Sequence, residues 1–156
     1  MAEAIRRYKY GGHVELARPL GDLLRGAARA AAPRVELVGP EPLHARRLAE
    51  RGYDQVALLS AAVAHELGVR HGVRALRRRR HTPRQAQLDR AARQANVAEA
   101  FLAAQPLTGR RVLLVDDVAT TGATLGACEA ALRRAGARTV GALVVARTPL
   151  AGAEPE

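Results

Sequence analysis

Residues 112–124 read VLLVDDVATTGAT, and this stretch decides the fold. Its first four residues, 112–115, are apolar and precede two acids, a pattern typical of a parallel strand buried on both faces. After a short turn, residues 122–135 have the pattern of a helix that Gly136 stops. A second apolar run at 140–146 completes a strand–helix–strand unit. The sequence therefore predicts an α/β fold with a mainly parallel sheet.

Further elements can be placed before this unit. We expect an amphipathic helix over residues 15–32, a short strand over 34–39, a second helix over 56–67 that ends at Gly68, and a short strand over 73–76. The apolar stripe of the first helix would contain Leu16, Leu20, Leu23 and Leu24. From residue 77 to about 95 there is no clear periodicity, which indicates a long exposed excursion. No repeat or linker divides the chain, so residues 1–156 are treated as one domain.

Composition restricts the class of protein. Hydrophobic residues make up 48% of the chain but aromatic residues only 3%, which favours a core of Ala, Val and Leu. There is no run of about 18 apolar residues, so no membrane segment is expected, and the first residues do not resemble a signal peptide. The single cysteine, Cys128, excludes an internal disulfide and is expected to lie in the core. These features predict a cytoplasmic protein.

The net charge of +10 is concentrated in one segment. Residues 70–93 contain nine arginines and one acid, whereas the rest of the chain is nearly balanced. The run Arg77–Arg80 could be a hood that covers a ligand, a solvated loop or a nucleic-acid patch. Few aromatic residues are interleaved for base stacking. We therefore expect at most weak, non-specific binding of single-stranded DNA; a homodimer is also left open.

The residues that follow the strand at 112–115 indicate the ligand. Ligands of parallel α/β sheets lie at the carboxyl ends of the strands, where Asp116 and Asp117 fall. The next turn offers backbone N–H groups and three threonine hydroxyls at the start of a helix, which suits a phosphate. Carboxylates accept hydrogen bonds from vicinal hydroxyls. The combination predicts a phosphorylated ribose.

Other interpretations of this stretch fit less well. The two acids alone could cap a helix, and a receiver domain also places an apolar run before an acidic pair. In a receiver domain, however, that run opens the domain, whereas here it begins only at residue 112. Neither the Gly-Lys-Ser/Thr of a Walker loop nor a Gly-x-Gly-x-x-Gly motif occurs in the sequence.

The same thirteen residues resemble the phosphoribosyl diphosphate (PRPP) motif of type I phosphoribosyltransferases. More of the chain is similar to the ComF family, a branch associated with competence for DNA uptake. The segments that carry this resemblance are YKYGG at 8–12, PEPLH at 40–44 and RGYDQ at 51–55. The family's hood segment resembles Thr82, Gln85, Leu88, Arg93, Asn96 and Phe101. The resemblance implies a type I phosphoribosyltransferase fold, with helices on both faces of the sheet and a small flexible hood at about 77–100.

The resemblance also implies an activity, the Mg²⁺-dependent transfer of a phosphoribosyl group from PRPP to an unknown nucleophilic acceptor. Asp116 and Asp117 would be catalytic and would hold the ribose, and Mg²⁺ would arrive with the diphosphate and could also bind Asp116. The 5-phosphate would lie against Val118, Ala119, Thr120, Thr121, Gly122, Ala123 and Thr124. The diphosphate would lie near Pro42, Leu43, His44, Arg47 and Arg51. The hood would contribute Arg80, Thr82, Gln85 and Arg93.

Some positions depart from the family's pattern or have an ordinary explanation. The four-cysteine zinc module with which many members begin is expected to be absent. Glu41 replaces an apolar residue and would repel the diphosphate unless it points away, and Asp54 adds another acid. His44, Arg47 and Arg51 could equally be solvated side chains. A non-catalytic module that binds PRPP and serves DNA uptake is therefore the alternative to an enzyme.

Overall fold

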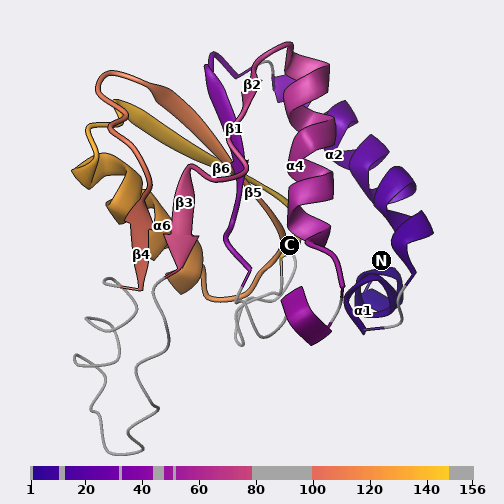
Figure 1. The fold of residues 1–156 in the computed structure, drawn as a ribbon. Helices are drawn as coiled ribbons and strands as arrows, with labels where there is room; N and C mark the ends of the chain where they lie inside the picture. The colour runs from indigo at the N-terminus through magenta and orange to yellow at the C-terminus, as the bar shows by residue number, and fades with distance from the viewer. Residues whose placement is uncertain are drawn as a thin grey trace, which may run out of the picture.

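The computed structural model describes residues 2–10, 13–31, 33–43, 48–50, 52–78 and 100–147. Its main sheet has four parallel strands in the order β2-β1-β5-β6 (Figure 1). These strands are β2 (Arg70–His71), β1 (Leu37–Pro40), β5 (Arg111–Ala119) and β6 (Thr139–Arg147). Leu37 of β1 is in register with Val112 of β5. The predicted α/β fold with a parallel sheet is therefore confirmed.

Helices cover both faces of this sheet. On one face lie α1 (Ala2–Tyr10), the short 3-10 helix η1 (Val14–Leu16), α2 (Ala17–Ala31) and α4 (Gln55–Leu67). The other face is covered by α6 (Ala123–Arg134), and Figure 1 shows it across the sheet from α2 and α4. Residues of β5 alternate between the two buried clusters, because side chains of a strand point to opposite faces in turn. The strand is thus buried on both faces, as predicted.

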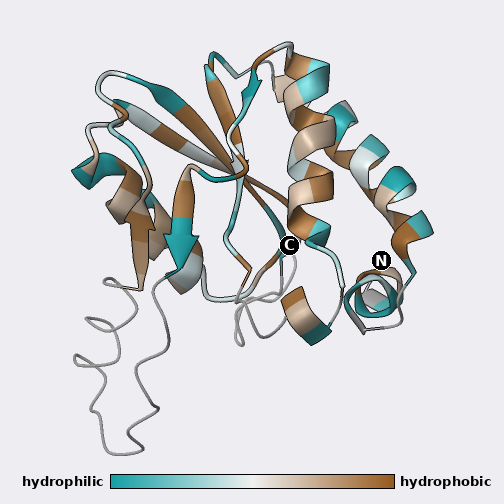
Figure 2. Cartoon of the chain, in the orientation of Figure 1, coloured by the Kyte–Doolittle hydropathy of each residue, from teal (hydrophilic) through white to brown (hydrophobic). Residues whose placement is uncertain are grey.

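The two buried clusters are separate cores. The cluster on the α2 and α4 side includes Tyr8, Leu24, Leu59, Leu113 and Val115. The cluster on the α6 side includes Phe101, Val112, Leu114, Cys128 and Leu132. Figure 2 shows hydrophobic residues along the central strands, whereas the side of α2 that faces away from α4 is mostly hydrophilic. Among the described residues, no helix is long and apolar enough to cross a membrane.

A small antiparallel ribbon lies beside the main sheet. Its strands are β3 (Leu76–Arg78) and β4 (Phe101–Ala103), which pair with each other and not with the parallel strands. The ribbon packs against α6 (Figure 1). It brings both ends of the predicted hood region to the α6 side of the sheet.

Several predicted elements need correction. The predicted strand at 73–76 is wrong, because Ala75 N–H donates to the Gly72 carbonyl at 2.9 Å and the chain turns there. The pattern 15–32 contains a 3-10 helix before α2, and Leu23 is 53% exposed rather than part of the buried stripe, which continues to Ala28. The strand predicted at 34–39 is β1, which begins only at Leu37. Helix α1 was not predicted. Helix α4 was predicted, and it ends as expected at Gly68, which adopts the left-handed conformation.

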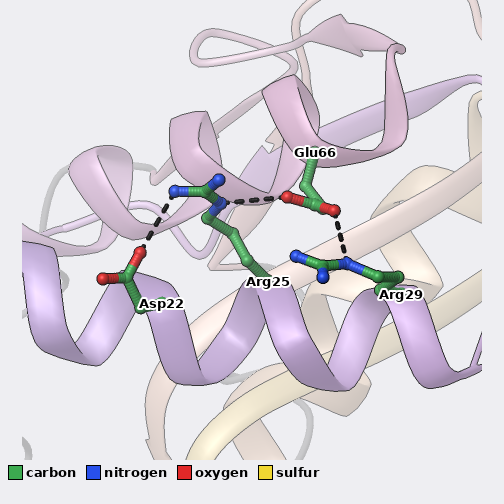
Figure 3. A network of polar contacts seen from close by, with 4 residues as sticks. All are labelled: Asp22, Arg25, Arg29 and Glu66. Carbon is green, nitrogen blue, oxygen red and sulfur yellow. Dashed lines mark hydrogen bonds and ion pairs between the residues drawn. The ribbon is translucent and has the colours of Figure 1, made fainter.

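An ion-pair network joins α2 to α4 (Figure 3). The Glu66 carboxylate of α4 accepts hydrogen bonds from Arg25 at 3.0 Å and from Arg29 at 2.8 Å, both on α2. Arg25 also donates to Asp22 at 3.1 Å, one turn earlier on α2. The network ties the C-terminal end of α4 to α2. The other end of this helix, at Gln55, reaches the carboxyl edge of the sheet.

The end of α6 provides a test of the fold. Gly136 has a φ of +95°, and a Cβ atom there would lie 3.0 Å from Thr108 Cα, so Gly136→Ala should lower the free energy of unfolding by about 1–3 kcal/mol. Gly126 is the matched control, because it lies inside α6 with open space around its Cα. Gly126→Ala should stabilise the protein by roughly 0.5–1 kcal/mol. Urea unfolding of the two variants measures both effects, and equal stabilities would contradict this account of the turn.

Candidate functional site

A cavity of about 160 Å³ lies at the carboxyl ends of β1 and β5. Its charged lining residues are Lys9, Glu41, Arg78, Asp116 and Asp117. The other lining residues are Pro42, Leu43, Gln55, Val56, Val118 and Thr124. The cavity therefore draws on α1, the segment after β1, the start of α4, the ribbon, and the strand and helix of the predicted motif.

The strand β5 is longer than the sequence predicted. It runs to Ala119, so Asp116 and Asp117 lie within the strand and are only 8% and 3% exposed. Val118 and Ala119 also belong to the strand rather than to the turn that was expected to bind phosphate. The Asp117 backbone N–H donates to Asp116 Oδ1 at 2.7 Å and helps to orient that carboxyl group.

Strand register brings Glu41 to Asp116. Pro40 is in register with Val115, and Glu41 N–H donates to the Val115 carbonyl at 2.8 Å. Glu41, which follows Pro40, therefore lies beside Asp116, which follows Val115. The side chains of Glu41 and Asp116 are hydrogen bonded to each other. Glu41 thus points into the cavity rather than away from it.

Burial makes this pair of acids share a proton. Burial first, and then the charge of Glu41, raise the pKa of Asp116 from 3.8 to about 9. Burial also raises the pKa of Glu41, while the hydrogen bond from Asp116 lowers it in part. Near neutral pH the pair therefore retains one proton between the two carboxyl groups.

The second acid of the motif has a different partner. Lys9 Nζ lies 2.7 Å from Asp117 Oδ1, and the two side chains are 23% and 4% exposed. The other oxygen, Asp117 Oδ2, is buried without a hydrogen-bond partner in the described part of the protein. An unpartnered buried acceptor is costly, and it is the kind of atom that a ligand hydroxyl would satisfy.

The turn between β5 and α6 remains open to a ligand. Gly122 has a φ of +77°, which glycine adopts readily, and it precedes the first residue of α6. The Thr120 and Thr121 side chains are exposed, and Thr121 Oγ1 accepts a hydrogen bond from Ala123 N–H at 3.3 Å. The first N–H groups of a helix have no partner within it and can bind an anion.

The structure places some of the remaining predicted site residues. Pro42 and Leu43 line the cavity. His44, Arg47, Arg51, Arg80, Thr82, Gln85 and Arg93 lie outside the described residues. Cys128 is fully buried in the α6-side cluster, and burial raises the pKa of its thiol, so it belongs to the core as expected.

Sequence reasoning missed three residues of the cavity, namely Lys9, Gln55 and Val56, whereas Arg78 belongs to the run Arg77–Arg80 that was considered as a hood. Two of them had a signal, because Lys9 and Gln55 belong to the segments 8–12 and 51–55 that resemble the ComF family. Asp54 is not in the lining: its carboxylate caps α4 by accepting the N–H groups of Val56 and Ala57. Its charge therefore interacts with the helix N-terminus.

Within the described ranges, no group of three His, Cys, Asp or Glu side chains could hold a metal ion by itself. The acids of the cavity nevertheless present carboxylate oxygens, which are the ligands that Mg²⁺ prefers. Mg²⁺ usually binds through one or two carboxylates together with phosphate oxygens of a substrate. The donor set therefore fits a Mg²⁺ ion that is shared with a phosphorylated ligand.

Comparisons with known proteins identify the family. The phosphoribosyl transferase domain family matches residues 57–156. The chain is 33% identical to the DNA utilization protein YhgH of Salmonella typhi, over 92% of this chain and 66% of that protein. It is 35% identical to competence protein F of Haemophilus influenzae, over 87% of this chain and 63% of that protein. The adenine phosphoribosyltransferase of Mycobacterium tuberculosis is 36% identical, over 85% of this chain and 71% of that enzyme.

The chain thus spans about two thirds of the length of these curated relatives. Solved structures agree on the fold. The glutamine PRPP amidotransferase of B. subtilis superposes with a TM-score of 0.63 at 21% identity, over 89% of this chain and 30% of that one. A purine phosphoribosyltransferase from Pyrococcus horikoshii superposes with a TM-score of 0.56 at 14% identity, over 89% and 78%. Together with the matched domain, these similarities show that the chain belongs to the phosphoribosyltransferase family, in the ComF branch of competence and DNA utilization proteins.

Proposed function

We propose that this protein binds PRPP together with Mg²⁺ and transfers the phosphoribosyl group to a nucleophile. The observation that most supports this is the combination of two buried carboxylates at the end of β5 with an exposed threonine turn at the start of α6. The first part suits the hydroxyls of a ribose, and the second suits its 5-phosphate. The two parts are joined by a few residues of chain, as the two ends of one ribose 5-phosphate require.

The ribose would be held by the acids of β5. Asp117 Oδ2 is buried and unpartnered, so a sugar hydroxyl could donate to it without displacing Lys9 from Oδ1. Asp116 would become a second acceptor after its proton is lost. The phosphate would be bound by backbone N–H groups at the start of α6 and by the hydroxyls of Thr120, Thr121 and Thr124.

The reaction would break the bond between ribose C1 and the diphosphate oxygen, with the electron pair leaving on diphosphate. The nucleophile forms the new bond to C1, where positive charge develops in the transition state. Asp116 and Asp117 would stabilise that charge from preorganised positions. Asp116 would be the residue that holds Mg²⁺, and the ion would supply positive charge that stabilises the leaving group.

A second candidate function is a PRPP-binding module without catalysis. Two observations favour it: Glu41 lies in the cavity as an additional acid, and the relatives include proteins named for competence and DNA utilization. Release of diphosphate from PRPP in the presence of candidate acceptors distinguishes the two functions. A cytoplasmic location, a homodimer and weak binding of single-stranded DNA stay predictions from the sequence.

PRPP with Mg²⁺ should raise the melting temperature of the protein. At a ligand concentration of about 100 times Kd, binding stabilises the native state by about 2.7 kcal/mol. Asp116→Asn combined with Asp117→Asn should abolish the shift, because the ribose loses both carboxylates. The matched control is Asp22→Asn on α2, which removes an exposed acid far from the cavity and should leave the shift unchanged. A full shift in the double variant would exclude this site.

The ligand-free protein should become less stable relative to Asp116→Asn as the pH rises from about 4 to about 9. Asp116 keeps its proton in the folded state up to a pKa of about 9, whereas the unfolded chain loses it near 3.8. The folded state therefore binds more protons than the unfolded chain in this pH window. The stabilising contribution of the Asp116 proton is fully present below the window and is lost as the pH rises through it. Urea unfolding of both proteins across the window measures the difference. A difference that does not change with pH would contradict the shared proton.

Glu41→Val should tighten the binding of PRPP at neutral pH. Without Glu41, the charge and the hydrogen bond that raise the pKa of Asp116 are removed, so more of Asp116 is ionised and able to accept a ribose hydroxyl. We expect an increase in affinity of roughly threefold to tenfold, or about 1 kcal/mol. Isothermal titration of the variant and the wild type measures it, and Glu41→Gln should behave similarly. Equal or weaker affinity in both variants would show that the pair does not oppose binding.

A further inference from the structure

Lys9 is the only lysine in the sequence, and it reaches the cavity from the N-terminal helix α1. This helix lies outside the segment matched by the phosphoribosyl transferase domain, which begins at residue 57. The similarity to that domain therefore assigns Lys9 no role. Its position in the cavity calls for one.

Buried contacts fix the end of α1 against the start of α4. Tyr8 is fully buried, and its hydroxyl donates to the Gln55 carbonyl at 2.7 Å. In return, the Tyr53 hydroxyl donates to the Tyr8 carbonyl at 2.6 Å, and the two rings lie 6.0 Å apart. Because these two hydrogen bonds fix Tyr8, they also fix the backbone of the adjacent Lys9 beside the cavity. Such restraint is typical of a residue that is positioned for a ligand.

Lys9 is one of two cations that the described lining of the cavity offers to an anionic ligand. Three acids line the cavity, against two cations among the described lining residues, Lys9 and Arg78. The guanidinium of Arg78 lies over the Phe101 ring, 5.4 Å from its centroid, and its charge also acts on the pKa of Glu41. An ammonium group has three N–H donors, and the contact of Lys9 with Asp117 Oδ1 at 2.7 Å uses one of them.

The position of α1 indicates which part of the ligand Lys9 would meet. Tyr8 packs in the cluster of the α2 and α4 face, whereas the proposed 5-phosphate turn leads into α6 on the opposite face. Glu41, which begins the segment after β1, is close enough to Lys9 for the ammonium charge to act on its pKa. Pro42 and Leu43 follow in that segment and line the cavity. The diphosphate is attached at the other end of the ribose from the 5-phosphate, so it would lie on this side of the acids.

We propose that Lys9 is a diphosphate-binding residue. One N–H of its ammonium group stays on Asp117 Oδ1, as in the ligand-free protein, and the others donate to a diphosphate oxygen of PRPP. Lys9 thereby links the group that holds the sugar to the group that leaves. This assignment rests on the proposed binding of PRPP.

The test compares two ligands, PRPP and ribose 5-phosphate, by isothermal titration with Mg²⁺ present. Lys9→Met should weaken PRPP by about tenfold or more, as loss of a charge-assisted hydrogen bond does. Ribose 5-phosphate lacks the diphosphate and should change by less than about threefold. Lys9→Arg, which keeps the charge, should recover part of the affinity for PRPP. Unchanged affinity of Lys9→Met for PRPP would overturn the assignment, and so would equal weakening of both ligands.

A second measurement does not depend on the folding of a variant. Because Lys9 is the only lysine, wild-type protein produced with ¹³C-labelled lysine gives a single side-chain Cε signal and keeps the ammonium group intact. Saturation with PRPP should shift this signal; a signal that does not move would overturn the role of Lys9. Failure of the wild type to bind PRPP by titration is a different result, because it overturns the proposed function itself.

Discussion

The burial of two carboxylates beside a third, partly buried one in a single small cavity is the constraint on which this site depends. Isolated buried charges are unfavourable, so each must be neutralised or paired. The protein does so in two ways, since Asp116 shares a proton with Glu41 and Asp117 pairs with the ammonium of Lys9. Both solutions require segments distant in sequence to meet at the same sheet edge. The register of β1 with β5 and the docking of α1 provide this arrangement.

Elements on both faces of the sheet contribute residues to the lining of the cavity. The α6 side contributes Thr124 and the ribbon residue Arg78, and the α2 and α4 side contributes Lys9 and Gln55. The sheet between them supplies the acids. A site built between two cores can be tuned from either one, because packing changes on one side move only part of the lining. The lining residues that precede residue 57, among them Lys9 and Gln55, lie outside the matched domain.

Local patterns in the sequence were sufficient for the parts of the fold that follow from them. Each of three correct predictions depended only on neighbouring residues. They are the buried strand from the apolar run at 112–115, the cavity lining from the acids after it, and the end of α4 from Gly68. The strand β5 was predicted too short, because Asp116 and Asp117 are polar and yet continue the ladder with β6. The role of Lys9 could not be predicted from its neighbours in sequence, since its partner Asp117 is brought near only by tertiary packing. The segment 73–76 has the apolar residues of a strand, but the chain turns there, and the Gly72 carbonyl accepts a hydrogen bond from Ala75 N–H.

The pairing of β1 with β5 has a consequence for how the molecule forms. Arg111 N–H donates to Glu36 at 2.9 Å across a separation of 75 residues, beside the register of Leu37 with Val112. Closing so long a loop costs chain entropy before any contact compensates for it, and folding is slow when such non-local pairings dominate. During synthesis, helix α4 can be complete before β5 has left the ribosome. The cavity, in contrast, cannot exist until β5 has been made and inserted between β1 and β6.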